Sequence, residues 1–178
     1  MDPFVDGLSK LEEECIAHGV PLLGREKGTW LYEQIQKIKP KTVLELGTAW
    51  GYSGCILTSA DARLTTIDWD WRSFQKATEE FAKRERDVES VLGDVMSVVP
   101  KLVERKEQYD LIFMDCEKRF YLPLLESCLI LLNDNGHIII DNIDHERAQD
   151  CKERALHHPK LDTKYLQIKD GILFCRKI

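Results

Sequence analysis

The sequence lacks the features that mark membrane, secreted and zinc-binding proteins. No apolar run reaches 18 residues, no basic-then-apolar leader stands at its start, and the six cysteines form no C-x-x-C pair. Cysteines scattered in this way behave as small apolar groups in a reducing compartment. We therefore expect a cytoplasmic protein with reduced thiols and no membrane contact.

An excess of basic residues is also missing. The chain carries 25 Lys and Arg against 31 Asp and Glu, a formal net charge of -6. This charge disfavours extended contact with nucleic acid, so a small or neutral substrate is easier to accommodate. The 178 residues contain no repeat or low-complexity linker and are enough to bury one core. We predict a single domain over residues 1–178, with leading cap helices in 1–40 and a sheet core in 41–178.

The most informative stretch is TVLELGTAWGYSG, residues 42–54. A short apolar run followed by Gly47, Gly51 and Gly54 predicts a strand, a glycine-rich turn and a helix. Backbone N–H groups at such a turn favour a polar or anionic ligand. The spacing is not the G-x-G-x-x-G of dinucleotide folds. The carboxylate of Glu45 inside the strand would repel a pyrophosphate, and it suits an ammonium group such as the methionine end of S-adenosylmethionine.

A second strand is predicted over residues 63–68 and ends at Asp68, 21 residues after Gly47. Folds of this kind place a carboxylate there, on the ribose hydroxyls of the ligand. Glu45 and Asp68 together therefore bracket an adenosyl ligand. The alternative is a generic nucleotide-type strand and turn with two incidental acids.

Strand and helix patterns alternate along the chain. Helices are expected over about 5–15, 26–38, 71–84, 98–103, 122–132 and 144–157, and further strands over 88–92, 109–114, 137–140, 163–168 and 172–176. Pro100 is expected in the first turn of its helix, where proline is tolerated. The tight turn of Lys169, Asp170 and Gly171 makes the last two strands a hairpin. The fold class is α/β: a seven-stranded, mostly parallel sheet with the last strand antiparallel and helices on both faces.

Polar residues end several of these strands. Asp115 follows the strand YDLIFM, and Asp141 with Asn142 follows another. Parallel sheets bind ligands at the carboxyl ends of their strands, so these side chains should converge. Their three oxygens suit Mg²⁺ or another hard divalent cation. Ordinary turn or cap residues are the alternative interpretation.

Taken together, VLELGTAWGYSG, LTTID, MDCEKRFYLPLLE and IIIDN resemble the cation-dependent O-methyltransferases of the catechol and caffeoyl-coenzyme A type, including short bacterial members. The resemblance covers about residues 20–142, with the motifs in the family's order. It implies a Rossmann-like methyltransferase domain that uses S-adenosyl-L-methionine, releases S-adenosyl-L-homocysteine and binds Mg²⁺ or another divalent cation. Lys27-Gly28 precedes Gly47 by the family's interval.

Site residues are carried over from this resemblance. It implies that the methionine end of the cofactor is held by Glu45, Gly47 and Ser53. The remaining cofactor contacts are Leu23 in a covering loop (residues 20–23), Ala49 in the turn, Asp68 at the ribose, and Trp69, Asp94, Val95, Asp115 and Cys116, most of them around the adenine. The metal ligands are Asp115, Asp141 and Asn142. Lys118, three residues past Asp115, is the general base that deprotonates the acceptor hydroxyl.

The chain departs from the family pattern after the Asp-Asn pair. Ile143 leads almost directly into a charged helix, which predicts a more open acceptor pocket, and Lys164 stands near the position of a family acid. The expected partner is a small acceptor with a vicinal or otherwise chelating hydroxyl. Hydroxyuridine in transfer RNA, a cofactor-binding module without turnover and a nicotinamide dehydrogenase are the alternatives, and a homodimer is left open.

Overall fold

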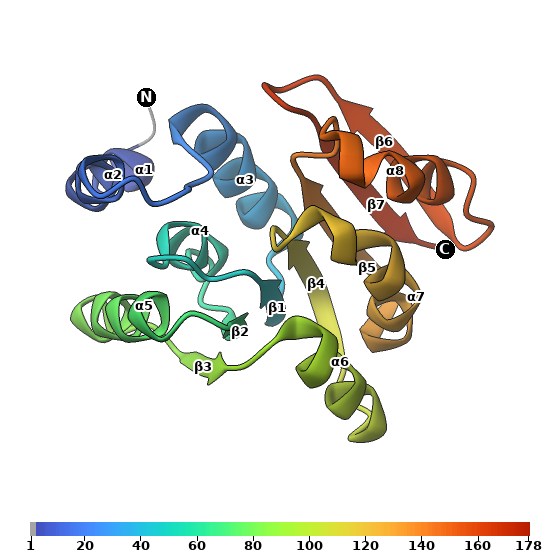
Figure 1. The fold of residues 1–178 in the computed structure, drawn as a ribbon, viewed down its shortest axis with the longest axis horizontal. Coiled ribbons are helices and arrows are strands. Elements are labelled where there is room, and N and C mark those ends of the chain that lie inside the picture. The colour runs from blue at the N-terminus through green and yellow to red at the C-terminus, as the bar shows by residue number, and fades with distance from the viewer. Residues whose placement is uncertain (1–2) are drawn as a thin grey trace.

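The computed structural model describes residues 3–178, which form one seven-stranded sheet flanked by helices (Figure 1). The first two residues of the predicted domain lie outside the described part of the chain. The strands are β1 (Thr42–Leu46), β2 (Arg63–Asp68), β3 (Val88–Leu92), β4 (Tyr109–Met114), β5 (Leu132–Asp141), β6 (Leu161–Leu166) and β7 (Ile172–Lys177). Their order across the sheet is β3-β2-β1-β4-β5-β7-β6.

The helices cover both faces of the sheet, as predicted. They are α1 (Pro3–Asp6), α2 (Ser9–Ala17), α3 (Arg25–Ile38), α4 (Tyr52–Leu57), α5 (Trp71–Lys83), α6 (Val95–Glu104), α7 (Tyr121–Leu131) and α8 (Gln149–Leu156), with short 3-10 helices η1 (Lys118–Phe120) and η2 (Glu146–Ala148). Figure 1 shows α3, α4 and α5 on one side and α6, α7 and α8 on the other.

Each face of the sheet has its own hydrophobic core. Within β1, Val43 packs on the face covered by α2 to α5, while Leu44 and Leu46 pack under α6 and α7. Alternate side chains of a strand point to opposite faces, so a strand buried on both faces is mostly apolar. This explains why the central strands β1 and β4 were recognisable as short apolar runs.

The hairpin at the end of the sheet is confirmed. β7 pairs antiparallel with β5 and with β6, while β1, β2, β3, β4 and β5 pair in parallel. Gly171 has a φ of +79° in the connecting turn, a conformation that glycine adopts without strain. The turn brings Asp170 to the same edge of the sheet as the end of β5. None of the helices in residues 3–178 is long and apolar enough to cross a membrane.

Several predicted boundaries were wrong. The helix expected over 5–15 is two helices, α1 and α2, separated at Gly7 and Leu8. Pro100 lies in the middle of α6, not in its first turn. Residues 144–157 are a turn, η2 and then α8, because His145 caps η2 by accepting a hydrogen bond from the Arg147 N–H at 3.1 Å. The strand expected over 137–140 is longer: β5 begins at Leu132 and includes residues 133–136, beside a register shift against β4.

Candidate functional site

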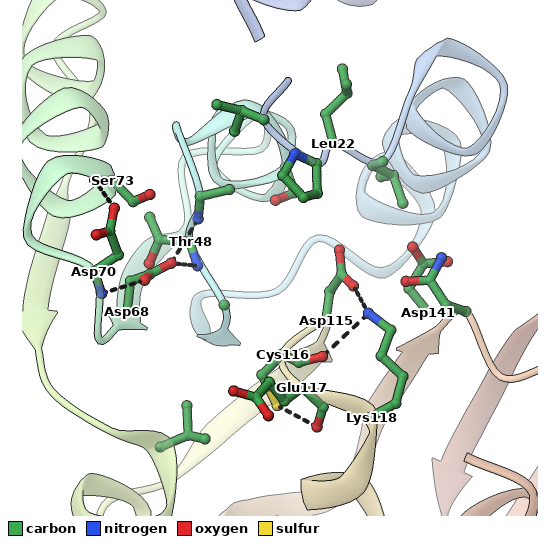
Figure 2. A pocket seen from close by; sticks show the side chains of 18 of the residues that line it. Leu22, Thr48, Asp68, Asp70, Ser73, Asp115, Cys116, Glu117, Lys118 and Asp141 are labelled. Carbon is green, nitrogen blue, oxygen red and sulfur yellow. Dashed lines mark hydrogen bonds and ion pairs between the residues drawn. The ribbon is translucent and has the colours of Figure 1, made fainter. Parts of the chain in front are cut away.

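A cavity of about 1140 Å³ opens at the carboxyl ends of β1, β2, β4 and β5 (Figure 2). Every site residue predicted from the sequence lines it except Glu45. The lining residues among them are Leu23, Gly47, Ala49, Ser53, Asp68, Trp69, Asp94, Val95, Asp115, Cys116, Lys118, Asp141 and Asn142. In the view of Figure 2, Asp68 and Asp141 lie on opposite sides of the cavity, with Asp115 and Lys118 between them.

Asp68 organises the turn after β1. Its Oδ2 accepts hydrogen bonds from the backbone N–H groups of Thr48 (3.0 Å) and Ala49 (2.9 Å), and its Oδ1 accepts from the Asp70 N–H at 2.9 Å. Asp70 in turn caps α5 by accepting from the Ser73 N–H at 2.8 Å. Since each carboxylate oxygen has about two acceptor positions, Oδ2 is filled, and Oδ1 keeps about one position for a donor from the cavity.

Glu45 lies beneath this turn and does not reach the cavity. Its carboxyl group is fully buried, where Ser53 Oγ donates to Oε1 at 2.5 Å and Thr66 Oγ1 donates to Oε2 at 2.6 Å. Burial raises the pKa of Glu45 to about 8, although these two hydrogen bonds oppose the shift. Glu45 therefore supports the turn from below. It is connected to the cavity wall through Ser53, which lines the cavity.

Gly47 is required by close packing at the end of β1. Its φ is +101°, and a Cβ at this position would collide with the carbonyl oxygen of Asp115, which directly follows the neighbouring strand β4. Glycine therefore allows the ends of β1 and β4 to approach each other. This approach places the turn of β1 beside Asp115.

The part of the cavity assigned to the adenine is open. Trp69 is 72% exposed, and Asp94 caps α6 by accepting from the Met96 N–H at 2.7 Å. Val95 is buried at the start of α6. The pKa of the Cys116 thiol is raised to about 12, first by burial and then by the charge of Asp115, so this cysteine stays protonated. The predicted covering segment, residues 20–23, lines the same cavity.

Lys118 and Asp115 meet in the cavity lining, between Asp68 and Asp141 in the view of Figure 2. Lys118 Nζ donates to Asp115 Oδ1 at 2.9 Å and to the Cys116 carbonyl oxygen at 3.2 Å. Burial raises the pKa of Asp115 even though Lys118 opposes the shift. The two residues form a partly buried ion pair, with the ammonium group held at a defined place next to the cavity.

Lys27 forms a second ion pair at the end of β5. This lysine of α3 is only 1% exposed, and its Nζ donates to Oδ1 of Asp141 and to Oδ1 of Asp170. Burial opposes its charge, but the two carboxylates raise the pKa of Lys27 above its ordinary value. The pKa of Asp141 is raised to about 6, first by burial and then by Asp115.

Asn142 is held by the same network. Its Nδ2 donates to Asp170 Oδ2 at 2.5 Å, and its φ of +52° is a left-handed conformation that Asn and Asp tolerate better than other side chains. Although burial opposes the shift, the hydrogen bonds from Lys27 and Asn142 lower the pKa of Asp170. Asp170 is therefore an ionised acceptor between two donors.

Sequence reasoning missed Lys27 and Asp170 as site residues. Lys27 appeared only as a spacing marker, and Asp170 only as a turn residue. A signal for Lys27 was available, because residues 27, 31 and 35 share one face of a helix and Leu31 and Ile35 are apolar. A charged residue on an apolar stripe needs a buried partner. No comparable signal identified Asp170.

The donor set beside Lys118 suits a divalent cation. Three carboxylates, those of Asp115, Asp141 and Asp170, face two ammonium groups, which leaves one negative charge in excess. No three His, Cys, Asp or Glu side chains of residues 3–178 form a metal-binding group by themselves. The candidate ligands are accordingly two carboxylates and the amide of Asn142, oxygen donors of the kind that Mg²⁺ prefers.

Comparison with known proteins supports a methyltransferase assignment. A family model described as O-methyltransferase matches residues 7–178. Catechol O-methyltransferase B of Danio rerio is 34% identical over 84% of this chain and 63% of that protein. Catechol O-methyltransferase of Bos taurus is 29% identical over 91% of this chain and 64% of that enzyme. The chain thus spans a little under two thirds of the length of these relatives.

Solved structures share the fold. One described as a putative caffeoyl-CoA O-methyltransferase from Staphylococcus aureus superposes with a TM-score of 0.87 at 24% identity, covering 99% of this chain and 93% of the other. An O-methyltransferase from Bacillus cereus in complex with SAH superposes with a TM-score of 0.86 at 21% identity, covering 100% of this chain and 92% of the other. At these identities the similarity establishes the Rossmann-like methyltransferase fold.

Proposed function

The chain belongs to the O-methyltransferase family, and from that premise we propose that it transfers a methyl group from S-adenosylmethionine to a small acceptor with chelating hydroxyl groups, with the help of a divalent cation. The observation that carries this proposal is that one cavity has two chemically different walls. Asp68 and the turn after β1 form one wall, and Asp115, Lys118, Asp141 and Asn142 form the other. Catechol and caffeoyl-CoA are named in the descriptions of the relatives, which supports a hydroxylated aromatic acceptor.

The cofactor would be held mainly through its ribose and adenine. Asp68 Oδ1 has acceptor capacity for a ribose hydroxyl, while Trp69 and Val95 offer apolar surface to the adenine. The methionine end would lie by Gly47 and Ser53, above the buried Glu45. When bound, S-adenosylmethionine supplies an electrophilic methyl group.

Lys118 is the proposed general base. Asp115 and the Cys116 carbonyl hold its Nζ in the cavity lining, where the amine in its neutral form accepts the proton of an acceptor hydroxyl. A divalent cation held by Asp115, Asp141 and Asn142 would lower the pKa of that hydroxyl. The remaining task of the protein is alignment, because the methyl transfer needs donor and acceptor atoms in line.

The first experiment separates the cofactor classes. Calorimetric titration with S-adenosylhomocysteine and, separately, with NAD is expected to show binding of the former only. Binding of NAD alone would instead identify a dinucleotide enzyme.

The second experiment tests the reaction. Methyl transfer is measured with a panel of catechol-type acceptors and with hydroxyuridine-containing anticodon-stem RNA, with Mg²⁺ or with excess chelator. We expect transfer to a catechol-type compound with Mg²⁺ and none with chelator. Asp141→Ala is expected to abolish the Mg²⁺-dependent transfer while S-adenosylhomocysteine still binds. Full activity in chelator would rule out the metal, and transfer to RNA alone would change the acceptor class.

A further inference from the structure

The end of β5 is connected to two residues that the proposed reaction does not use. Lys27 reaches it from α3 and Asp170 from the turn before β7, and both hold residues assigned to the metal. Lys27 is 1% exposed and cannot contact an acceptor in solution. Burying an ammonium group is costly unless it is paired, so a specific role for this pairing is expected.

The network settles which atom of Asn142 is available to the cavity. Lys27 Nζ donates to Oδ1 of Asp170, and the amide nitrogen of Asn142, Nδ2, donates to Oδ2 of the same side chain at 2.5 Å. The amide oxygen is then the atom left for the cavity. An amide turned the other way would present nitrogen, which does not coordinate Mg²⁺.

The same network restricts Asp141. Oδ1 accepts from Lys27, and no other side chain of residues 3–178 has a hydrogen bond to this carboxylate. Tyr121 OH donates to the backbone carbonyl of Asp141 at 3.0 Å and fixes the main chain there. Lys27 thus occupies Oδ1, and the backbone N–H of Asn142 also donates to this carboxylate. Among the described residues no side chain donates to Oδ2, the oxygen that Asp141 can turn toward a ligand in the cavity that it lines.

We propose that Lys27 and Asp170 are positioning residues, which turn Asp141 and Asn142 so that each presents one oxygen to a divalent cation. Lys27 holds the carboxylates of Asp141 and Asp170, and Asp170 in turn fixes the orientation of the Asn142 amide. Groups that orient metal ligands in this way typically contribute 10- to 100-fold to metal affinity. The inference rests on the proposed metal site and adds to it the residues that determine its geometry.

The test uses Mn²⁺ as the probe and binding as the readout. Free Mn²⁺ is followed by electron paramagnetic resonance during titration of the full chain saturated with S-adenosylhomocysteine. In Asp170→Asn, the one side-chain oxygen has to stay on Lys27, which can only donate, so the new NH₂ group faces Asn142. Asn142 must then turn its oxygen toward residue 170 and present its nitrogen to the cavity. We expect Mn²⁺ affinity to fall about 10- to 100-fold, with the melting temperature and S-adenosylhomocysteine affinity retained.

One further variant controls for charge, and another tests whether an oxygen at position 142 restores the affinity. Glu117→Gln removes one negative charge from the same cavity wall without touching the network, since Glu117 pairs with Arg119. It is expected to change Mn²⁺ affinity less than about threefold, as an exposed charge is well screened. The exchange Asn142→Asp with Asp170→Asn keeps the total charge and reverses the donor and acceptor. Because a carboxylate at position 142 presents oxygen on either side, this double variant is expected to recover the wild-type affinity.

Two results would overturn the inference: an equal loss in Asp170→Asn and Glu117→Gln, or a folded double variant that stays as weak as Asp170→Asn. If the wild-type chain binds no Mn²⁺, both the inference and the metal part of the proposed function fail. Wild-type binding that is insensitive to Asp170→Asn refutes the positioning role alone.

Discussion

Lys118 Nζ lies 2.9 Å from Asp115 Oδ1 and 3.2 Å from the Cys116 carbonyl oxygen, so the amine is fixed by the end of β4 and does not move freely in solvent. A lysine held in this way next to two further candidate metal ligands differs from a surface lysine at a helix start. The difference has measurable consequences.

Lys118→Met is expected to lower the rate of methyl transfer by about 10²- to 10⁴-fold, the contribution of a positioned general base. Cofactor affinity should be retained, because Lys118 lies on the wall opposite Asp68. The ratio of wild-type to variant rates is measured from about pH 6.5 to 9.5 and should fall as pH rises, since hydroxide increasingly replaces the missing base. Equal rates throughout this range would exclude Lys118 as the base.

Asp68→Ala is expected to weaken S-adenosylhomocysteine by about 1.5 to 3 kcal/mol, the range for hydrogen bonds to a charged group. Calorimetry measures the loss. Because Asp68 also accepts from the Thr48 and Ala49 amides, the turn itself should become less stable. Asp70→Ala is the matched control: it removes the α5 cap and lowers the melting temperature, but affinity should be kept. Equal affinities of both variants and the wild type would remove Asp68 from the cofactor site.

Glu45→Gln is expected to change how stability depends on pH. The pKa of Glu45 is about 8 in the folded chain against 4.5 for an ordinary glutamate, so between these values the folded state binds more protons than the unfolded state. The free energy of unfolding of the wild type should therefore fall as pH rises from about 5 to 8, by on the order of a few kcal/mol from this group. Gln cannot titrate and should lack this component.

Urea unfolding of the wild type and of Glu45→Gln at several pH values measures the difference. Glu89→Gln, on the exposed side of β3, is the control and should follow the wild type. Parallel curves for the wild type and Glu45→Gln would show that Glu45 is ionised over the whole range.

Lys27→Met is expected to lower the free energy of unfolding by about 3 to 5 kcal/mol, because it leaves the carboxylate of Asp141 buried without its partner. Lys37→Met, on the same helix, removes an exposed pair with Glu33 at 3.9 Å and should leave the stability within error of the wild type. Chemical denaturation of the wild type and both variants measures the two losses of stability. A similar small effect at both positions would show that Asp141 gains enough solvation when Lys27 is absent.

The central strands β1 and β4 could be predicted from the sequence because they are buried on both faces and read as short apolar runs. The break between α1 and α2 could not, since Val5, Leu8 and Leu11 keep the helical spacing across it and are all buried. Boundaries in residues 132–149 also failed, because backbone pairing with β4 and the cap at His145 decide them.

The residues of the site were predicted better than their contacts. The strand pattern located Asp115, Asp141 and Asn142 at strand ends, and the family resemblance implied their role; the structure places them in one cavity. It did not show that Glu45 is covered by Ser53 and Thr66, or that Asn142 is held by Asp170. Both facts depend on which residues from other elements arrive next to these side chains, and a single sequence does not record that.

The contacts of Lys27 also constrain how the chain acquires its site during folding. Its two partners lie 114 and 143 residues further along the sequence. Contacts of such separation form late, because the entropy of closing a long loop must first be offset by other interactions. A partly folded or nascent chain that has already paired β1, β2 and β4 would contain the turn at Asp68 but not the Lys27 network. Capacity to bind the cofactor should thus appear earlier in folding than the completed metal site, and refolding followed by both probes would resolve two events.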